Sequence, residues 1–357
     1  MPFSVLTDTS GNLPRRLAEE HGLAVIPFVY CIDGEDFTCT DIEAFDGESF
    51  YRRMKDGQVV TTSQISPQQY ADFFEPHLKV GRDVLFISMS SGISGSYNSA
   101  NIAADMLKED YPERKVRVID TMGAALGEGL VALRAADCRG REMSLEETVE
   151  ELTRYSRRMC NVFTVDDLLF LRRGGRLSNM AAIVGTVLNI KPLLKGDEEG
   201  KIVAFAKLRG RRRAIEALAE RYDALAVNPE TQTVGIVNAA CPEDAQKLAM
   251  LLRRNRPPKE IISVNYEPVT GCHVGPGALA LFFEGGDDVR TAVNEAKPAA
   301  SAVKTVLESA KAPLDTVKTA LENAKPLDTV KSAIDSAKVP LSTVKNAIDS
   351  VKSNLKK

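Results

Sequence analysis

The chain has no tryptophan, only three histidines, and no run of the roughly 20 apolar residues that a membrane span requires. Its six cysteines are scattered without a Cys-x-x-Cys pair, which argues against a disulfide framework or a zinc site. The sequence contains no Walker motif and no histidine pair with metal-ligand spacing. The amino end lacks a basic segment followed by an apolar stretch. We therefore expect a cytoplasmic protein that uses no metal or cofactor.

Charge is unevenly distributed along the 357 residues, whose net charge is −3. Residues 297–357 carry +5, which leaves −8 for residues 1–296. An acidic main body has no overall electrostatic footprint for nucleic acid, so no nucleic-acid partner is expected. The length predicts about two domains. The basic carboxyl-terminal tail is a separate feature.

The most informative stretch is the serine-rich turn at residues 90–100, Ser-Ser-Gly-Ile-Ser-Gly-Ser-Tyr-Asn-Ser-Ala. It follows an apolar run, Asp83 to Met89, that is typical of a buried strand, and it precedes a segment of helical periodicity up to Leu107. Two glycines permit a tight bend, and the hydroxyls and free amides at a helix amino terminus favour an anion. An ordinary serine-rich helix cap is the alternative interpretation.

The amino-terminal half alternates strands with helices, which predicts a parallel sheet covered on both faces. In such sheets ligands bind beyond the carboxyl ends of the strands, where the Thr7, Thr61 and Ser90 loops are expected. The predicted strands are 3–6, 23–32, 83–89 and 115–120, and helices are expected from Pro14 and Ser66-Pro67 and over 47–54, 100–107, 123–139 and 144–158.

Beyond residue 160 the pattern predicts a second, smaller α/β domain with an antiparallel component. A basic loop and helix containing Lys207, Arg209 and Arg211 lies within it. The expected boundaries are an α/β domain at 1–158, a second α/β domain at 159–288 and a helical repeat tail at 289–357. The predicted strands are 161–164, 190–194, 202–206, 233–238, 261–268 and 278–283, with helices at 166–173, 180–188 and 242–254.

Two enzyme classes can be weighed against a binding protein. A serine hydrolase or acyltransferase would use Ser94 as nucleophile with Asp120 and His273, but a serine stands where the second glycine of G-x-S-x-G belongs. A dinucleotide fold is disfavoured because residues 123–129 do not match G-x-G-x-x-G. Glycines and prolines shape a loop around His273, which favours a functional role for that residue, and Arg176 follows a glycine pair that frees it to point inward.

Eight short motifs occur in order over about residues 1–285. They are Leu6–Thr9, Thr62-Ser63-Gln64, Ser91–Tyr97, Val118–Asp120, Val165–Leu168, Leu171–Arg176, Ile190–Pro192 and His273–Gly277. Through these motifs and their order the chain resembles the DegV family. The resemblance implies a two-domain α/β protein that binds one long-chain fatty acid between its domains. It also implies a non-enzymatic subunit in phospholipid synthesis, whose carboxylate ligand a separate ATP-dependent fatty-acid kinase converts to an acyl phosphate.

The resemblance also assigns roles to individual residues. Thr62 and Ser94 would hydrogen-bond the carboxylate, and His273 would support it. The Gly95 and Ser96 amides add donors, and Arg176 and Arg209 are expected near the carboxyl end or at the kinase surface. Thr9 and Thr121 stand where the family more often has serine, with the hydroxyl kept. A buried alkyl chain contributes about 0.8 kcal/mol per methylene, and the predicted tunnel walls are residues 180–188 and 278–283.

The tail consists of repeats rich in alanine, lysine and valine, with Pro313, Pro326 and Pro340 at intervals of about fourteen residues. Its apolar residues recur at heptad spacing, which predicts short amphipathic helices that each open at a proline. A lysine-rich polar face suits an anionic lipid surface. Peripheral membrane or lipid contact, self-association and a disordered appendage all remain open for residues 297–357.

Overall fold

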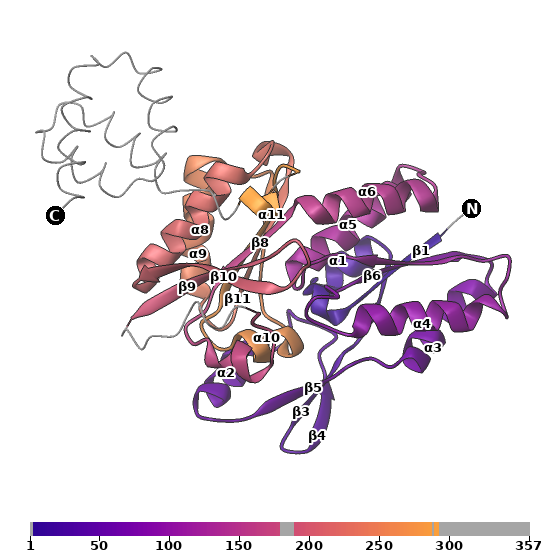
Figure 1. The fold of residues 1–357 in the computed structure, drawn as a ribbon, viewed down its shortest axis with the longest axis horizontal. Coiled ribbons are helices and arrows are strands. Elements are labelled where there is room, and N and C mark those ends of the chain that lie inside the picture. Colours follow the sequence, from indigo (N-terminus) through magenta and orange to yellow (C-terminus); the bar gives the residue numbers. More distant parts are fainter. Residues whose placement is uncertain (1–2, 179–188, 288, 293–357) are drawn as a thin grey trace, which may run out of the picture. The chain divides into compact units, whose positions relative to one another are not determined.

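Residues 3–178, 189–287 and 289–292 are described by the computed structural model, and they form a mixed α/β fold (Figure 1). The predicted parallel sheet is confirmed, with strand order β2-β1-β6-β7. The elements of this half are β1 (Phe3–Asp8), η1 (Thr9–Gly11), α1 (Arg15–Glu20), β2 (Leu23–Ile26), β3 (Val29–Ile32), β4 (Glu35–Thr38), α2 (Gly47–Lys55), β5 (Val60–Ser63), α3 (Pro67–Lys79), β6 (Asp83–Ser88), α4 (Ser96–Lys108), β7 (Val116–Asp120), α5 (Leu126–Gly140) and α6 (Leu145–Arg158).

Helices cover both faces of this sheet, as the alternation along β6 requires. Leu85 and Ile87 lie in the apolar core that includes α5, whereas Val84 and Phe86 lie in the core that includes α3 and α4. Successive strand residues point to opposite faces, so the two cores are on opposite sides. Helices α3 and α6 start where the sequence predicted, at Ser66 and Ser144, and in the structure each of these serines forms a capping box.

The second sheet is mixed, with order β10-β9-β8-β13-β11-β12. Its pairs are antiparallel except β11 with β12, so the predicted antiparallel component is confirmed. The elements are β8 (Met159–Thr164), α7 (Leu169–Arg173), β9 (Ile190–Gly196), β10 (Ile202–Arg209), α8 (Arg211–Leu225), η3 (Pro229–Thr231), β11 (Thr233–Asn238), α9 (Pro242–Asn255), β12 (Glu260–Asn265), α10 (Pro268–Val274), β13 (Leu279–Glu284) and α11 (Val289–Ala292).

Helix α5 joins the two sheets. It contacts β1 and β6 of the first sheet and β8, β11 and β13 of the second. Helices α8 and α9 pack against each other and against the second sheet, where a separate apolar core forms (Figure 1). Contacts from beyond the carboxyl ends of β1 and β6 also reach the second half: Asn12 Nδ2 donates to the carbonyl of Asn265 at 2.7 Å, and Ser90 Oγ donates to that of Gly200 at 2.8 Å.

A third sheet was not predicted. The expected strand 23–32 is divided at Pro27, which has no N–H to donate; β2 pairs with β1, whereas β3 pairs with β4 and β5 in the order β4-β3-β5. The prediction of a loop at Thr61 is therefore wrong, because Thr61 and Thr62 lie on β5 opposite β3. Four residues are too few for alternation to be recognised in a hydroxyl-rich segment.

Three further expectations are wrong. The strand expected to reach Pro268 ends at Asn265, and the segment 268–274 is helix α10 rather than a loop. The Glu267 carboxylate caps it by accepting from the amides of Val269 and Thr270. Lys207 and Arg209 lie on β10 and not in a basic loop.

The predicted helix at 180–188 and the repeat tail fall outside the described residues. The domain boundaries at 158/159 and 288/289 remain predictions. In the described part of the chain, no helix combines the length and apolar character that crossing a membrane demands.

Candidate functional site

A cavity of about 240 Å³ is lined by residues of both halves of the fold. The first half contributes β5, the Ser90 turn and the loop after β7, and the second half contributes β8, β13 and α10. Five of the seven predicted site residues line it. They are Thr62, Ser94, Gly95, Arg176 and His273.

Thr62 and His273 are in contact at this cavity. The Thr62 hydroxyl Oγ1 lies 3.1 Å from His273 Nε2. Strand β5 places Thr62 opposite Tyr30, while His273 lies on the last turn of α10. The backbone of Gly174 lies against the other ring nitrogen, because a Cβ built there would be 2.5 Å from Nδ1. Any side chain at residue 174 would displace the imidazole.

The electrostatics keep this imidazole neutral. Burial, assisted by the nearby positive charge of Arg176, lowers the pKa of His273 from its usual 6.5 to about 4. At neutral pH the ring therefore has one N–H donor and one acceptor nitrogen. A neutral histidine beside a threonine hydroxyl can orient a carboxylate without neutralising its charge.

Ser94 lies where the Ser90 turn enters α4. Its amide donates to the carbonyl of Ser90 at 3.1 Å, which forms the bend before the helix. Its hydroxyl donates to Ser96 Oγ at 2.9 Å and accepts from the Ser96 amide at 3.2 Å. Ser94 thus presents a hydroxyl oxygen at a helix amino terminus, a position that favours negative charge.

Gly95 and Ser96 have different places in this turn. Gly95 lines the cavity, and a Cβ there would meet the amide of Gln64, so a larger residue would displace the end of that side chain. Ser96 is fully buried and does not line the cavity. The Ser96 hydroxyl and amide both hydrogen-bond the Ser94 hydroxyl and so fix its position.

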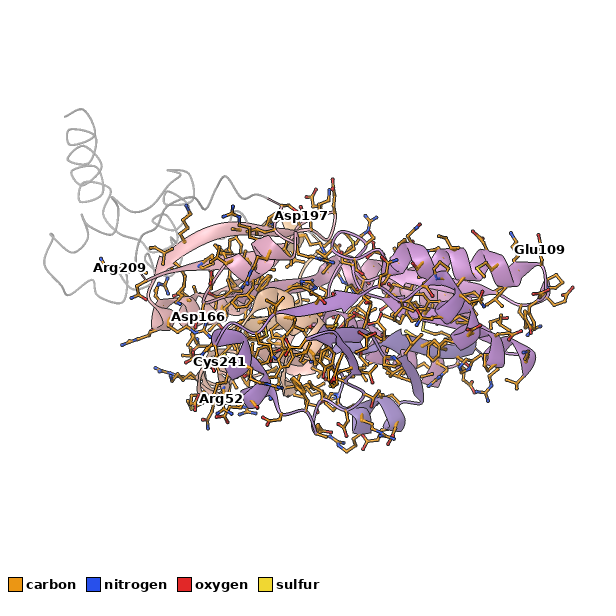
Figure 2. All side chains as sticks on the ribbon, turned by 90° about the horizontal axis from the view of Figure 1, so that it is seen from below. Arg52, Glu109, Asp166, Asp197, Arg209 and Cys241 are labelled. Carbon is orange, nitrogen blue, oxygen red and sulfur yellow. The ribbon has the colours of Figure 1, made fainter. Side chains whose placement is uncertain are left out.

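The two predicted arginines are separated. Arg176 lines the cavity, and its Nε donates to the carbonyl of Ile93 at 3.2 Å while Nη1 donates to the carbonyl of Gly174. Both of these acceptors are uncharged, so they leave the guanidinium charge available to an anion. Arg209 is exposed at the end of β10, paired with Ile190. Figure 2 shows it well separated from Asp197, which follows the other end of strand β9.

The groups that a serine hydrolase would need are not joined in the described structure. His273 contacts Thr62 rather than Ser94. The Asp120 carboxylate accepts from the Ser91 hydroxyl at 2.5 Å and from the Met122 amide at 2.8 Å. Ser94, Asp120 and His273 therefore make separate contacts rather than a catalytic triad.

The remaining lining is largely apolar and includes Met89, Met122, Phe163 and Phe282. Phe282 belongs to the segment expected to form a tunnel wall, whereas the other expected wall, 180–188, lies outside the described residues.

The sequence analysis did not identify Asn161 as a site residue. Asn161 and Phe163 lie on the same face of β8 and line the cavity, whereas Val162 between them lies on the other face. The sequence signal for Asn161 was a single polar residue on an otherwise apolar strand face.

A buried acidic pair lies beside the predicted Thr7 loop. Burial raises the pKa of Asp8 to about 6, and burial together with the Asp8 charge raises that of Glu128 well above its usual range. Ser10 Oγ donates to Glu128 Oε2 at 2.7 Å, and Thr7 Oγ1 donates to Glu128 Oε1 at 3.1 Å. Thr7 is part of β1 and fixes α5 to the sheet; it does not line the cavity.

Comparison with known proteins matches residues 2–285 to a family model described as an uncharacterised protein of the DegV family. A DegV domain-containing protein of Clostridium perfringens is 34% identical over 283 residues, which cover 79% of this chain and 97% of that protein.

Solved structures agree with this assignment. A DegV family protein from Thermus thermophilus, described by its fatty-acid binding, is 30% identical with a TM-score of 0.72 and covers 80% of this chain and 100% of its own. DegV from Bacillus subtilis, described as a fatty acid binding protein, is 30% identical with a TM-score of 0.70 over the same shares. The two-domain fold is common to these structures and this chain.

Proposed function

Because this chain belongs to the DegV family, we propose that it binds one long-chain fatty acid in the cavity, with the carboxylate towards Thr62, Ser94 and His273. The observation that carries the proposal is the gathering of these side chains on one apolar cavity. A carboxylate removed from water needs hydrogen-bond donors. The Arg176 guanidinium supplies N–H groups, and the Thr62 hydroxyl can donate when it accepts from His273 Nε2. The Ser94 hydroxyl can donate to the ligand by turning its proton away from Ser96 Oγ.

The apolar lining supplies the affinity in this proposal. Each buried methylene contributes about 0.8 kcal/mol, so a long alkyl chain outweighs one hydroxyl contact to the carboxylate, which contributes about 1.5–3 kcal/mol. The polar end then sets the orientation of the ligand. Two similar proteins described as binding fatty acids support this choice of ligand.

We further propose that the protein presents the carboxylate to a separate ATP-dependent fatty-acid kinase and does not itself catalyse a reaction. The sequence has no Walker motif of its own, which is why the phosphoryl donor would come with a partner. Arg176 at the cavity and the exposed Arg209 are the cations proposed for the carboxyl end or the kinase surface. A cytoplasmic location belongs to the same proposal.

The binding step is tested by displacement of a fluorescent fatty acid. Protein loaded with cis-parinaric acid is titrated with oleate, oleyl alcohol and methyl oleate, which share one alkyl chain. We expect oleate to displace the probe at the lowest concentration, because only oleate carries the charge that the polar end recognises. Equal potency of all three compounds would mean that the polar end does not bind a carboxylate.

A further inference from the structure

Arg290 lies on α11, beyond residue 285 where the family match ends. The residue is 7% exposed. It donates hydrogen bonds to four backbone carbonyl oxygens, those of Met122 at 3.0 Å, Asp197 at 3.1 Å, Ser156 at 2.8 Å and Arg157 at 3.3 Å. A buried guanidinium with this set of acceptors fixes the backbone segments that provide them.

These carbonyls come from three separate segments. Ser156 and Arg157 are in the last turn of α6, where the helix dipole favours a cation. Met122 is in the loop after β7, and Asp197 opens the turn between β9 and β10. Arg290 therefore connects the first half of the fold to the β9–β10 turn of the second half.

Met122 shows how tightly one of these segments is held. Its φ of 53° is unusual for a residue with a side chain, and such a conformation persists only where its surroundings fix it. The Met122 amide donates to Asp120 Oδ1 at 2.8 Å, and its carbonyl accepts from Arg290. Asp120 and Arg290 thus hold the same residue through its amide and its carbonyl.

Both segments form part of the cavity wall. Met122 lines the cavity, as do Gly196 and Gly200 at the two ends of the β9–β10 turn. The Ser90 hydroxyl donates to the carbonyl of Gly200 at 2.8 Å, and a Cβ on Gly92 would lie 2.6 Å from the Glu199 carbonyl. The turn therefore packs directly on the serine-rich turn that leads to Ser94.

We propose that Arg290 is a positioning residue that holds this wall closed and so slows the exchange of the bound fatty acid. The proposal rests on fatty-acid binding in the cavity. In this proposal Arg290 does not contact the ligand. Arg290 acts through Met122 and the β9–β10 turn. Arg290 lies outside residues 2–285, which match the family model, because α11 follows residue 285.

The test uses the full chain carrying Arg290→Met, Arg290→Lys or Val289→Ala. Val289 is a matched control because it is 1% exposed, adjoins Arg290 and packs in the core of the second sheet without lining the cavity. Each protein is loaded with cis-parinaric acid, and the dissociation rate is followed after mixing with excess oleate.

We expect Arg290→Met to raise the dissociation rate at least about tenfold, which corresponds to about 1.4 kcal/mol. Arg290→Lys should give an intermediate rate, because one ammonium group cannot reach all the carbonyls. Val289→Ala should change the rate less than about twofold even though it lowers the melting temperature. An unchanged rate in Arg290→Met, or an equal increase in Val289→Ala, would overturn the proposal.

A second readout separates this proposal from the proposed function. If the wild-type chain does not bind the probe, the proposed function is wrong. Hydrogen exchange of the protein without ligand then tests separately whether Arg290 holds the two backbone segments. We expect the peptides covering residues 120–126 and 195–201 to exchange faster in Arg290→Met than in Val289→Ala. Equal exchange in the two variants would show that Arg290 does not hold these segments.

Discussion

The hydroxyl of Thr62 is the most direct probe of the polar end, because Thr62→Val removes it with little change of shape. The substitution eliminates the 3.1 Å contact with His273 and one donor to the ligand carboxylate. A hydrogen bond to a charged group is worth about 1.5–3 kcal/mol, so the dissociation constant for oleate should rise about 10- to 150-fold. For oleyl alcohol, a neutral bond of about 0.5–1.5 kcal/mol predicts a rise of about 2- to 10-fold.

The neighbouring residue supplies the control for this prediction. Thr61 lies on the same strand but its side chain is exposed, so Thr61→Val makes the same chemical change on the other face of β5. Displacement titrations should show no change for Thr61→Val and a nearly wild-type constant for Thr62→Ser, which keeps the hydroxyl. If Thr62→Val weakens oleate and oleyl alcohol by the same factor, Thr62 shapes the cavity and does not recognise the carboxylate.

Three other outcomes are expected. Ser94→Ala should reduce acyl-phosphate formation by a partner kinase, measured by trapping with hydroxylamine, more than it reduces lipid retention. The control is Ser91→Ala, because the Ser91 hydroxyl contacts Asp120. Equal loss of acyl-phosphate formation and of lipid retention in Ser94→Ala would count against the assignment. The pKa of His273 is about 4 in the folded protein and about 6.5 in the unfolded chain, so between these pH values only the unfolded chain binds the proton. The wild-type protein should therefore lose about 1–2 kcal/mol of stability between pH 7 and pH 5, and His273→Gln should not show this loss. Urea unfolding at both pH values measures that difference, and parallel losses in the two proteins would contradict it. Deleting residues 297–357 should abolish flotation with anionic vesicles if the tail contacts lipid, and unchanged flotation would exclude it as a lipid anchor.

The parallel sheet could be predicted because its signals are local. The apolar run over β6 and the helix starts at Ser66 and Ser144 are each indicated by a few neighbouring residues. The family motifs added the site residues, and the structure brings Thr62 and His273 together although they are 211 residues apart. Their local structure was predicted wrongly because β5 has only four residues and α10 only seven.

Arg290 could not be found from the sequence. Its acceptors are backbone carbonyls between 93 and 168 residues away, and a carbonyl has no sequence signature. The charge of Arg290 also gave no signal, because an isolated arginine after the last strand is typical of a solvated surface. Contacts from a side chain to distant backbone are fixed only when the fold brings the segments together.

Lipid analysis of the purified full-length protein tests the central claim most directly. Gentle purification, organic extraction and mass spectrometry should find a free long-chain fatty acid at about one molecule per chain. Thr62→Val purified in parallel should retain the same class of lipid at lower occupancy. Protein that yields no fatty acid, and that does not take one up when incubated with oleate, would contradict the account.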